Sequence, residues 1–325
     1  MKHSVYQVQQ GSSLAGLLTP WNARLGSLDA ATGSFTDRKE SHAAAGPSGQ
    51  GFCGILGSGQ VLVGTPGMSA ICRRLAQQPG IEGQWGAKVN RAIQQQGGLW
   101  EVIAEVGKDK QEHTALHSVL VLADQMNVRS ESPGYVELQC SSTGPVTRKL
   151  DSIQRSPRFS LMLALRRDTI RAPFDGASVA NSSTIEWVAR DSSKPGRERD
   201  DGVECWVAVT TEGFSEHLLS EKPLTQDGRY LPQSQDDLSN AAGIIWAALQ
   251  DVLRPFLGEE LAPVYLQAQR WGSAFKATTL EEPCLWDPSL RLAACGDFCR
   301  QSDLEGAILS GLAAADAIMD GAQRR

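Results

Sequence analysis

The chain has 325 residues, of which 41% are hydrophobic, and a formal net charge of −6. This length and composition are typical of a globular protein with one large domain or two intertwined domains. The net negative charge gives no sign of a basic surface that would bind nucleic acid, so no nucleic-acid partner is expected. No run of 18 apolar residues is present, so no transmembrane segment is expected either.

Cysteine and histidine usage indicates free thiols and no metal site. The seven cysteines lack a C-x-x-C spacing, and the five histidines form no cluster with them. We interpret Cys295 and Cys299 as small buried residues, with redox-sensitive thiols as the alternative. The N-terminus lacks the apolar segment of a secretory signal. We therefore expect a protein of the cytoplasm or an organellar stroma, and a plastid location stays open if the natural N-terminus lies upstream.

Apolar periodicity and turn residues divide the chain into a series of expected elements. Residues 21–35 contain turn-forming residues at the spacing typical of a hairpin, and residues 37–51 have the composition of a surface loop. Short apolar or alternating runs predict strands, and a 3.6-residue period predicts helices. The expected strands are 60–64, 85–89, 100–106, 117–123, 159–166, 185–189, 205–210 and 263–270, and the expected helices are 68–77 and 240–256.

The end of the chain carries the most informative pattern. A short apolar run leads into a Gly296-Asp297 turn, and a helix is expected to begin at Ser302. Ser302 and Glu305 have the spacing of a capping box, and the N–H groups at such a helix start favour a phosphate. Gly306 removes a side chain that would keep a ligand from the backbone, and Asp297 could accept hydrogen bonds from sugar-like hydroxyls. An ordinary capped amphipathic helix is the competing interpretation.

Gly296-Asp297 followed by Ser302-Asp303-Leu304-Glu305-Gly306-Ala307 resembles, in order and spacing, the C-terminal FAD-binding motif of the amine-oxidase superfamily of flavoproteins. The resemblance implies that Asp297 contacts the ribityl chain of FAD and that the helix start faces the pyrophosphate. The other cofactor-binding residues that it implies are Gly296, Ser302, Leu304, Glu305, Gly306 and Ala307.

Further segments resemble the renalase-like FAD/NAD(P)-binding oxidoreductases of this superfamily. Residues 61–70, VLVGTPGMSA, match their VGxPGMSAL segment, and residues 21–29 and 174–197 fit the same group. The resemblance implies hydride transfer to FAD from a small-molecule substrate, either a reduced nicotinamide dinucleotide or an amine-like compound. By position it places Val89 near the adenine and Trp271 on the substrate side of the flavin. It implies no catalytic side chain, because the isoalloxazine performs the hydride chemistry.

The expected fold class is α/β in the mixed α+β sense. An incomplete FAD/NAD(P)-binding Rossmann-like domain is interleaved with a substrate domain built on a mixed, largely antiparallel sheet. Residues 1–55 are expected to supply loops and part of the substrate domain, 56–125 part of the FAD domain, and 126–280 the substrate domain. Residues 281–325 are expected to supply the C-terminal FAD-binding strand and helix.

The sequence shows no strand–G-x-G-x-x-G–helix unit, which holds the ADP half of FAD in such proteins. Gly54, Gly57 and Gly59 come nearest, but they stand in the wrong order. The alternative hypothesis is therefore a truncated, non-catalytic relative that cannot hold FAD and acts at most as a binding module. Since each 1.4 kcal/mol changes affinity about tenfold, a site with half its contacts is expected to bind FAD at about tens of micromolar or more weakly.

Overall fold

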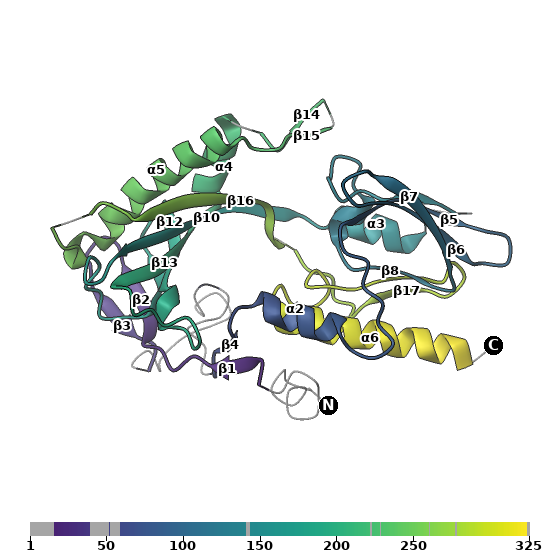
Figure 1. Ribbon diagram of the computed structural model, residues 1–325, viewed down its shortest axis with the longest axis horizontal. Coiled ribbons are helices and arrows are strands. Elements are labelled where there is room, and N and C mark those ends of the chain that lie inside the picture. The colour runs from purple at the N-terminus through teal and green to yellow at the C-terminus, as the bar shows by residue number, and fades with distance from the viewer. Residues whose placement is uncertain are drawn as a thin grey trace.

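The computed structural model describes residues 16–39, 52, 59–140, 144–221, 223–227, 229–259, 261–276 and 278–323. The described chain is a mixed α+β protein with two lobes (Figure 1), and this confirms the expected fold class. Most of the loop expected at 37–51 lies outside the described residues, as do Gly54 and Gly57. No helix among the described residues is long and apolar enough to cross a membrane.

The first lobe is built on a seven-stranded sheet with the strand order β16-β10-β13-β12-β11-β2-β3. All neighbouring strands are antiparallel except β11 and β2. Two helices, α4 and α5, cover one face of this sheet (Figure 1). The elements are β2 (Leu25–Asp29), β3 (Phe35–Asp37), β10 (Arg155–Arg166), β11 (Gly176–Ala180), β12 (Ile185–Arg190), η4 (Asp191–Ser193), β13 (Val203–Thr210), α4 (Glu212–Glu221), α5 (Gln235–Leu253), η5 (Arg254–Phe256) and β16 (Tyr265–Lys276).

Alternation along β10 explains why the sheet has two different faces. Phe159, Leu161 and Leu163 are buried on the side of α5, in the largest apolar core of the described chain. Arg158 and Ser160 alternate with them and therefore point to the opposite face. The polar wall of a pocket on that face thus follows from the same two-residue period that builds the core.

The second lobe combines two smaller sheets, with the strand orders β7-β6-β5-β9 and β17-β18-β8. In the smaller sheet β18 runs parallel to β8 and antiparallel to β17. Its core contains the fully buried Trp100, Leu150 and Phe298. The elements are β5 (Ala87–Gln94), β6 (Trp100–Val106), β7 (Gln111–His117), β8 (Leu120–Leu122), η3 (Gln125–Val128), β9 (Glu137–Gln139), α3 (Pro145–Ser152), β17 (Leu285–Asp287), β18 (Leu292–Ala294) and α6 (Leu304–Gln323).

Two long strands connect the lobes. β10 begins and β16 ends at the junction, where Arg155 pairs with Lys276 (Figure 1). The sequence predicted β16 to end near residue 270, because its last residues carry no clear apolar alternation. The remaining elements are β1 (Leu18–Pro20), β4 (Leu62–Gly64), α2 (Ser69–Ala76), β14 (Thr225–Gln226) and β15 (Arg229–Tyr230).

Two elements differ from expectation for local reasons. β7 was not expected as a separate strand, because all seven of its side chains are exposed and give no alternating pattern. α5 begins five residues before the expected start, because Ser234 and Asp237 form a capping box there. It ends just before Pro255, since proline cannot continue the helical hydrogen bonding.

Candidate functional site

The predicted Gly296-Asp297 turn lies between β18 and α6. Cys295 N–H donates to Leu122 O at 3.1 Å, which extends the pairing of β18 with β8. Gly296 N–H donates to the buried Ser310 hydroxyl of α6 at 3.0 Å. A Cβ at Gly296 would lie 2.5 Å from the Phe298 ring, so this position requires glycine. The turn is therefore fixed by both the strand before it and the helix after it.

The cap of α6 is Asp303, so the expected capping box of Ser302 and Glu305 is wrong. Gly306 N–H donates to Asp303 Oδ1 at 2.7 Å, and Ala307 N–H donates to Asp303 O at 3.0 Å. The Ser302 hydroxyl instead accepts from the Lys276 backbone N–H at 3.4 Å. Serine and aspartate are both good caps, and the hydrogen bond from β16 holds Ser302 away from the helix.

The start of α6 is more occupied than the sequence indicated. A Cβ at Gly306 would lie 2.0 Å from Gln301 O, so the glycine makes room for the preceding backbone rather than for a ligand. The N–H groups of Gly306 and Ala307 are also used within the chain. Leu304 is exposed at the helix start. Fewer donors therefore face a ligand than an uncapped helix start would offer.

Asp297 is the best placed of the predicted cofactor ligands. Its side chain is 38% exposed, and Lys276 Nζ lies 3.5 Å from Oδ2. The Lys276 side chain is only 8% exposed, so a buried ammonium stands next to an accessible carboxylate. The accessible carboxylate oxygens of Asp297 can accept hydrogen bonds from hydroxyl groups.

Val89 and Trp271 lie on two other strands, β5 and β16, and not in the Gly296-Asp297 turn. Val89 is on β5, half-buried against the core of the second lobe. Trp271 is on β16 and is 53% exposed, with its indole N–H donating to Ser160 Oγ at 2.8 Å. Trp271 pairs in register with Arg158, so the two side chains share one face of the first-lobe sheet.

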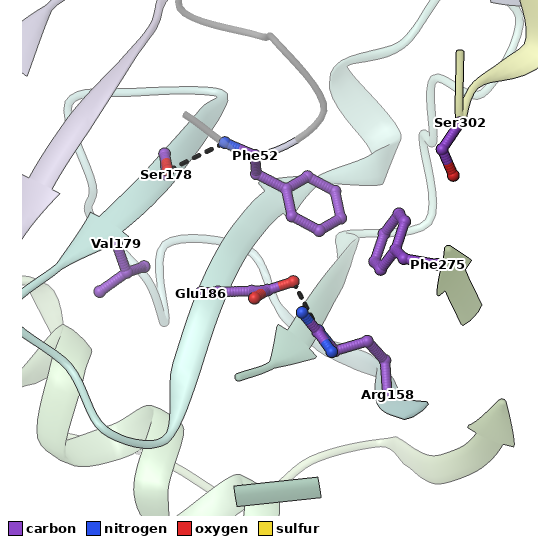
Figure 2. Close-up of a pocket in the computed structure, with 7 residues that line it drawn as sticks. All are labelled: Phe52, Arg158, Ser178, Val179, Glu186, Phe275 and Ser302. Carbon is purple, nitrogen blue, oxygen red and sulfur yellow. Dashed lines mark hydrogen bonds and ion pairs between the residues drawn. The ribbon is translucent and has the colours of Figure 1, made fainter. Parts of the chain in front are cut away.

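A pocket of about 360 Å³ lies between that face and the chain leading into α6 (Figure 2). Of the predicted site residues, Ser302 lines it. The other lining residues come from the strands of the first lobe and from Phe52. The lining residues are Phe52, Arg158, Ser178, Val179, Glu186, Phe275 and Ser302.

An ion pair forms the polar wall of the pocket. Arg158 Nε donates to Glu186 Oε1 at 2.9 Å (Figure 2), and the two side chains are 11% and 24% exposed. Arg158 also donates to Ser156 Oγ and to Pro157 O. Burial raises the pKa of Glu186, and Arg158 partly opposes this effect. The pair is thus held in one orientation by several contacts and can present polar atoms to a bound molecule.

Aromatic rings form an adjoining wall. The Phe52 and Phe275 ring centroids are 5.6 Å apart in an edge-to-face arrangement, and Phe52 also stacks on Trp187 at 5.3 Å. Arg158 lies over the Phe275 ring at 5.3 Å. Phe52 N–H donates to Ser178 Oγ at 3.1 Å, which fixes this residue on β11. Such walls suit a small flat molecule with hydrogen-bonding groups along one edge.

Arg158, Glu186 and Phe275 were not predicted as site residues from the sequence. A usable signal was present, because Arg158 and Glu186 are charged residues next to apolar strand runs, where unpaired charges are rarely buried. Glu186 lies at a register shift between Ile185 and Trp187. Bulges of this kind redirect a side chain. The residue pattern of the strand does not predict where a bulge occurs.

A second pocket, of about 620 Å³, lies between the β14–β15 hairpin and the segment after β8. Glu131, Arg155 and Tyr230 are among its lining residues. Arg155 is already engaged by Glu131. None of the residues predicted for a site is among those that line it, so the smaller pocket is the better candidate.

No known family model matches the chain. Among solved structures, an oxidoreductase from Methanosarcina mazei aligns with a TM-score of 0.47 and 14% sequence identity. The alignment covers 79% of this chain and 55% of that one, so the chain spans about half the length of the structure it matches. At this level of similarity, function has to be argued from the chain's own residues.

Proposed function

We propose that the protein is an FAD-dependent oxidoreductase of the renalase type. Its reaction would transfer a hydride to the flavin from a small molecule, either a reduced nicotinamide dinucleotide or an amine-like compound. One observation carries the proposal: Ser302, in the motif that resembles a flavin site, lines the same pocket as Arg158 and Glu186. A candidate cofactor site and a candidate substrate pocket therefore share a wall.

The C-terminal turn fits FAD in part. Asp297 offers an accessible carboxylate for the hydroxyls of a ribityl chain, and Gly296 holds the turn close to α6. Gly306 does not support the fit, because the backbone of Gln301 fills the space beside it. When bound, FAD would supply the hydride-accepting chemistry.

The pocket residues would bind and orient the substrate. Phe52 and Phe275 offer apolar surface to a flat ring and keep water from it. Arg158 can donate to a carbonyl, and Glu186 can accept from an amide or amine N–H. Because burial raises its pKa, Glu186 can also hold a proton at a pH where an exposed glutamate would be ionised.

The test is anaerobic reduction of FAD-loaded protein by a panel of reduced nicotinamide dinucleotides and primary amines, followed at the flavin absorption band. We expect at least one compound to bleach the flavin. Glu186→Gln should slow this reduction by about tenfold or more, equivalent to about 1.4 kcal/mol, while leaving FAD affinity unchanged. Glu216→Gln, at an exposed position on α4 outside the pocket lining, is the matched control.

The outcomes also separate the proposal from its alternative. Flavin that binds but is bleached by no member of the panel would favour a binding module over an enzyme. Failure to bind FAD at all would favour the non-catalytic relative. Equal reduction rates in wild type and Glu186→Gln would show that the pocket described here does not hold the substrate.

A further inference from the structure

Cys284 directly precedes β17 and Cys295 directly follows β18, so both flank the open end of this strand pair. The antiparallel register pairs Leu285 with Ala294 and Trp286 with Ala293. One step outward, the same register sets Cys284 opposite Cys295. Directly opposite residues on antiparallel strands point to the same side of the sheet, with Cβ atoms about 4.5–5.5 Å apart.

We propose that Cys284 and Cys295 form a reversible intramolecular disulfide. Opposite residues of an antiparallel pair have Cα atoms about 4.5–5.5 Å apart, and disulfides join Cα atoms about 4.4–6.8 Å apart. Both cysteines are free thiols and are partly exposed. The bond can therefore form without a large backbone movement, and neither cysteine is fully buried.

Cys299 is the third thiol of this region, but it is a poorer partner. It is fully buried behind the Gly296 turn, where its backbone N–H donates to Gly296 O at 3.2 Å. Burial chiefly raises the pKa of Cys295, and the Cys299 and Cys284 thiols add to this effect. No group of three or more His, Cys, Asp or Glu side chains in the described chain is placed to hold a metal ion. We therefore interpret Cys284, Cys295 and Cys299 as thiols that can react with one another, and not as metal ligands.

The oxidant that balances the reaction is a low-molecular-weight disulfide such as glutathione disulfide. One cysteine thiolate attacks it, forms a mixed disulfide and releases one glutathione. The second cysteine thiolate attacks the mixed disulfide, closes the Cys284–Cys295 bond and releases the second glutathione. Burial raises the pKa of both thiols, so few thiolates are present near neutral pH and the exchange should accelerate as the pH rises.

The disulfide would connect β17 directly to the turn that follows β18. Cys295 is the residue before Gly296, and Cys284 is the residue before β17. Oxidation would therefore restrain the backbone that carries Asp297, whatever ligand that carboxylate serves. The inference is independent of the flavin proposal, because it rests on strand register and on two partly exposed cysteines.

The test is disulfide mapping of the purified 325-residue chain. Reduced protein is incubated with glutathione disulfide, alkylated, digested with trypsin without reduction and analysed by mass spectrometry. Trypsin places Cys284 in residues 277–291, and Cys295 together with Cys299 in residues 292–300. We expect these two peptides to be cross-linked, with loss of two of the seven thiols. Fragmentation of the wild-type cross-link assigns the sulfur within 292–300 without any variant.

Substitutions provide a second, independent assignment. Cys299→Ser should keep the cross-link, whereas Cys284→Ser and Cys295→Ser should abolish it. Cys72→Ser, at an exposed cysteine on α2, is the control and should change nothing. A link from Cys284 to Cys299, a loop within 292–300, or only mixed disulfides with glutathione would each overturn the proposal.

Discussion

Two buried tryptophans lie in the cores of the two lobes, and they differ in what their indole N–H groups contact. Trp206 in the first lobe is 1% exposed, and its Nε1 has no hydrogen-bond partner among the described residues. Trp100 in the second lobe is fully buried, and its Nε1 donates to Leu290 O at 2.9 Å and to Arg291 O at 3.2 Å. The tryptophan of the first lobe thus contributes packing without an indole hydrogen bond inside the described chain, whereas that of the second lobe also contributes hydrogen bonds.

The difference shows how each half of the candidate site is held. The first lobe is stabilised mainly by apolar packing of a large sheet against α5, and that rigid sheet carries Arg158 and Glu186. The second lobe holds the segment between β17 and β18 by specific hydrogen bonds from residues almost 200 positions away, including Gln94 Nε2 to Leu290 O at 2.7 Å. Those contacts position the strand that leads to Asp297.

The largest expected effect is a loss of core packing. Phe159→Ala removes a fully buried ring from the first lobe and should lower its free energy of unfolding by about 3–5 kcal/mol. Phe298→Ala is the matched change in the second lobe. Urea denaturation followed by circular dichroism measures both. A cost below about 1 kcal/mol for Phe159→Ala would contradict the account of the first-lobe core.

The tryptophan comparison can be tested with the same conservative change in each lobe. Trp100→Phe and Trp206→Phe both remove volume, but Trp100→Phe also removes the hydrogen bonds to Leu290 O and Arg291 O. These carbonyls keep a second donor each, Gln94 Nε2 and the Leu120 N–H. We therefore expect Trp100→Phe to cost about 0.5–1.5 kcal/mol more than Trp206→Phe, the net contribution of a hydrogen bond. Chemical denaturation gives the difference, and equal costs would show that the hydrogen bonds of Trp100 do not hold the second lobe.

A pH series tests the burial of Glu186. Burial raises its pKa above the ordinary 4.5, so the folded state binds this proton more tightly than the unfolded chain. The resulting stabilisation is complete below pH 4.5 and is lost as the pH rises through the raised pKa. Wild type should therefore lose stability relative to Glu186→Gln over that interval, as measured by denaturation at successive pH values.

Glu282 provides a control of opposite sign. Its hydrogen bond to Lys149 lowers the pKa of its carboxyl, so its contribution is present above its ordinary pKa of 4.5 and is lost as the pH falls. Both side chains are partly exposed, so solvent screening should make this effect weak. If Glu186 and Glu282 gave the same change of stability with pH, the ion pair with Arg158, and not burial, would dominate the pKa of Glu186.

The smallest effect is expected at β7. Leu116 is 61% exposed on a strand whose side chains all face solvent. Leu116→Ala should change the free energy of unfolding by no more than about 0.5 kcal/mol, whereas Leu161→Ala, in the first-lobe core, should cost about 2–5 kcal/mol. A large cost at Leu116 would indicate that β7 is covered by something beyond the described chain.

Local patterns were sufficient to predict much of the fold. Alternation located β10 and β13, a 3.6-residue period located most of α5, and the Gly296-Asp297 turn was found between its strand and helix. These features depend on neighbours within a few residues. The helix cap shows the limit, because choosing Asp303 over Ser302 depends on a hydrogen bond from Lys276 on β16.

The pocket depends on contacts that no local pattern encodes. Arg158 and Glu186 meet although β13 lies between their strands in the sheet, and a bulge in β12 sets the direction of Glu186. Gly306 was correctly placed at the start of α6, but its neighbour proved to be Gln301 rather than open space. Register and backbone proximity of this kind become visible only once the chain is folded.

The most direct test of the central claim is a fluorescence titration of FAD with the 325-residue chain. We predict saturable binding at about tens of micromolar or weaker. Asp297→Ala should weaken it by a further tenfold or more, since a charge-assisted hydrogen bond contributes about 1.5–3 kcal/mol. Asp316→Ala, at an exposed carboxylate on α6, should match wild type. No saturable binding up to about 1 mM, or equal affinities for the two variants, would contradict a flavin site at the C-terminal turn.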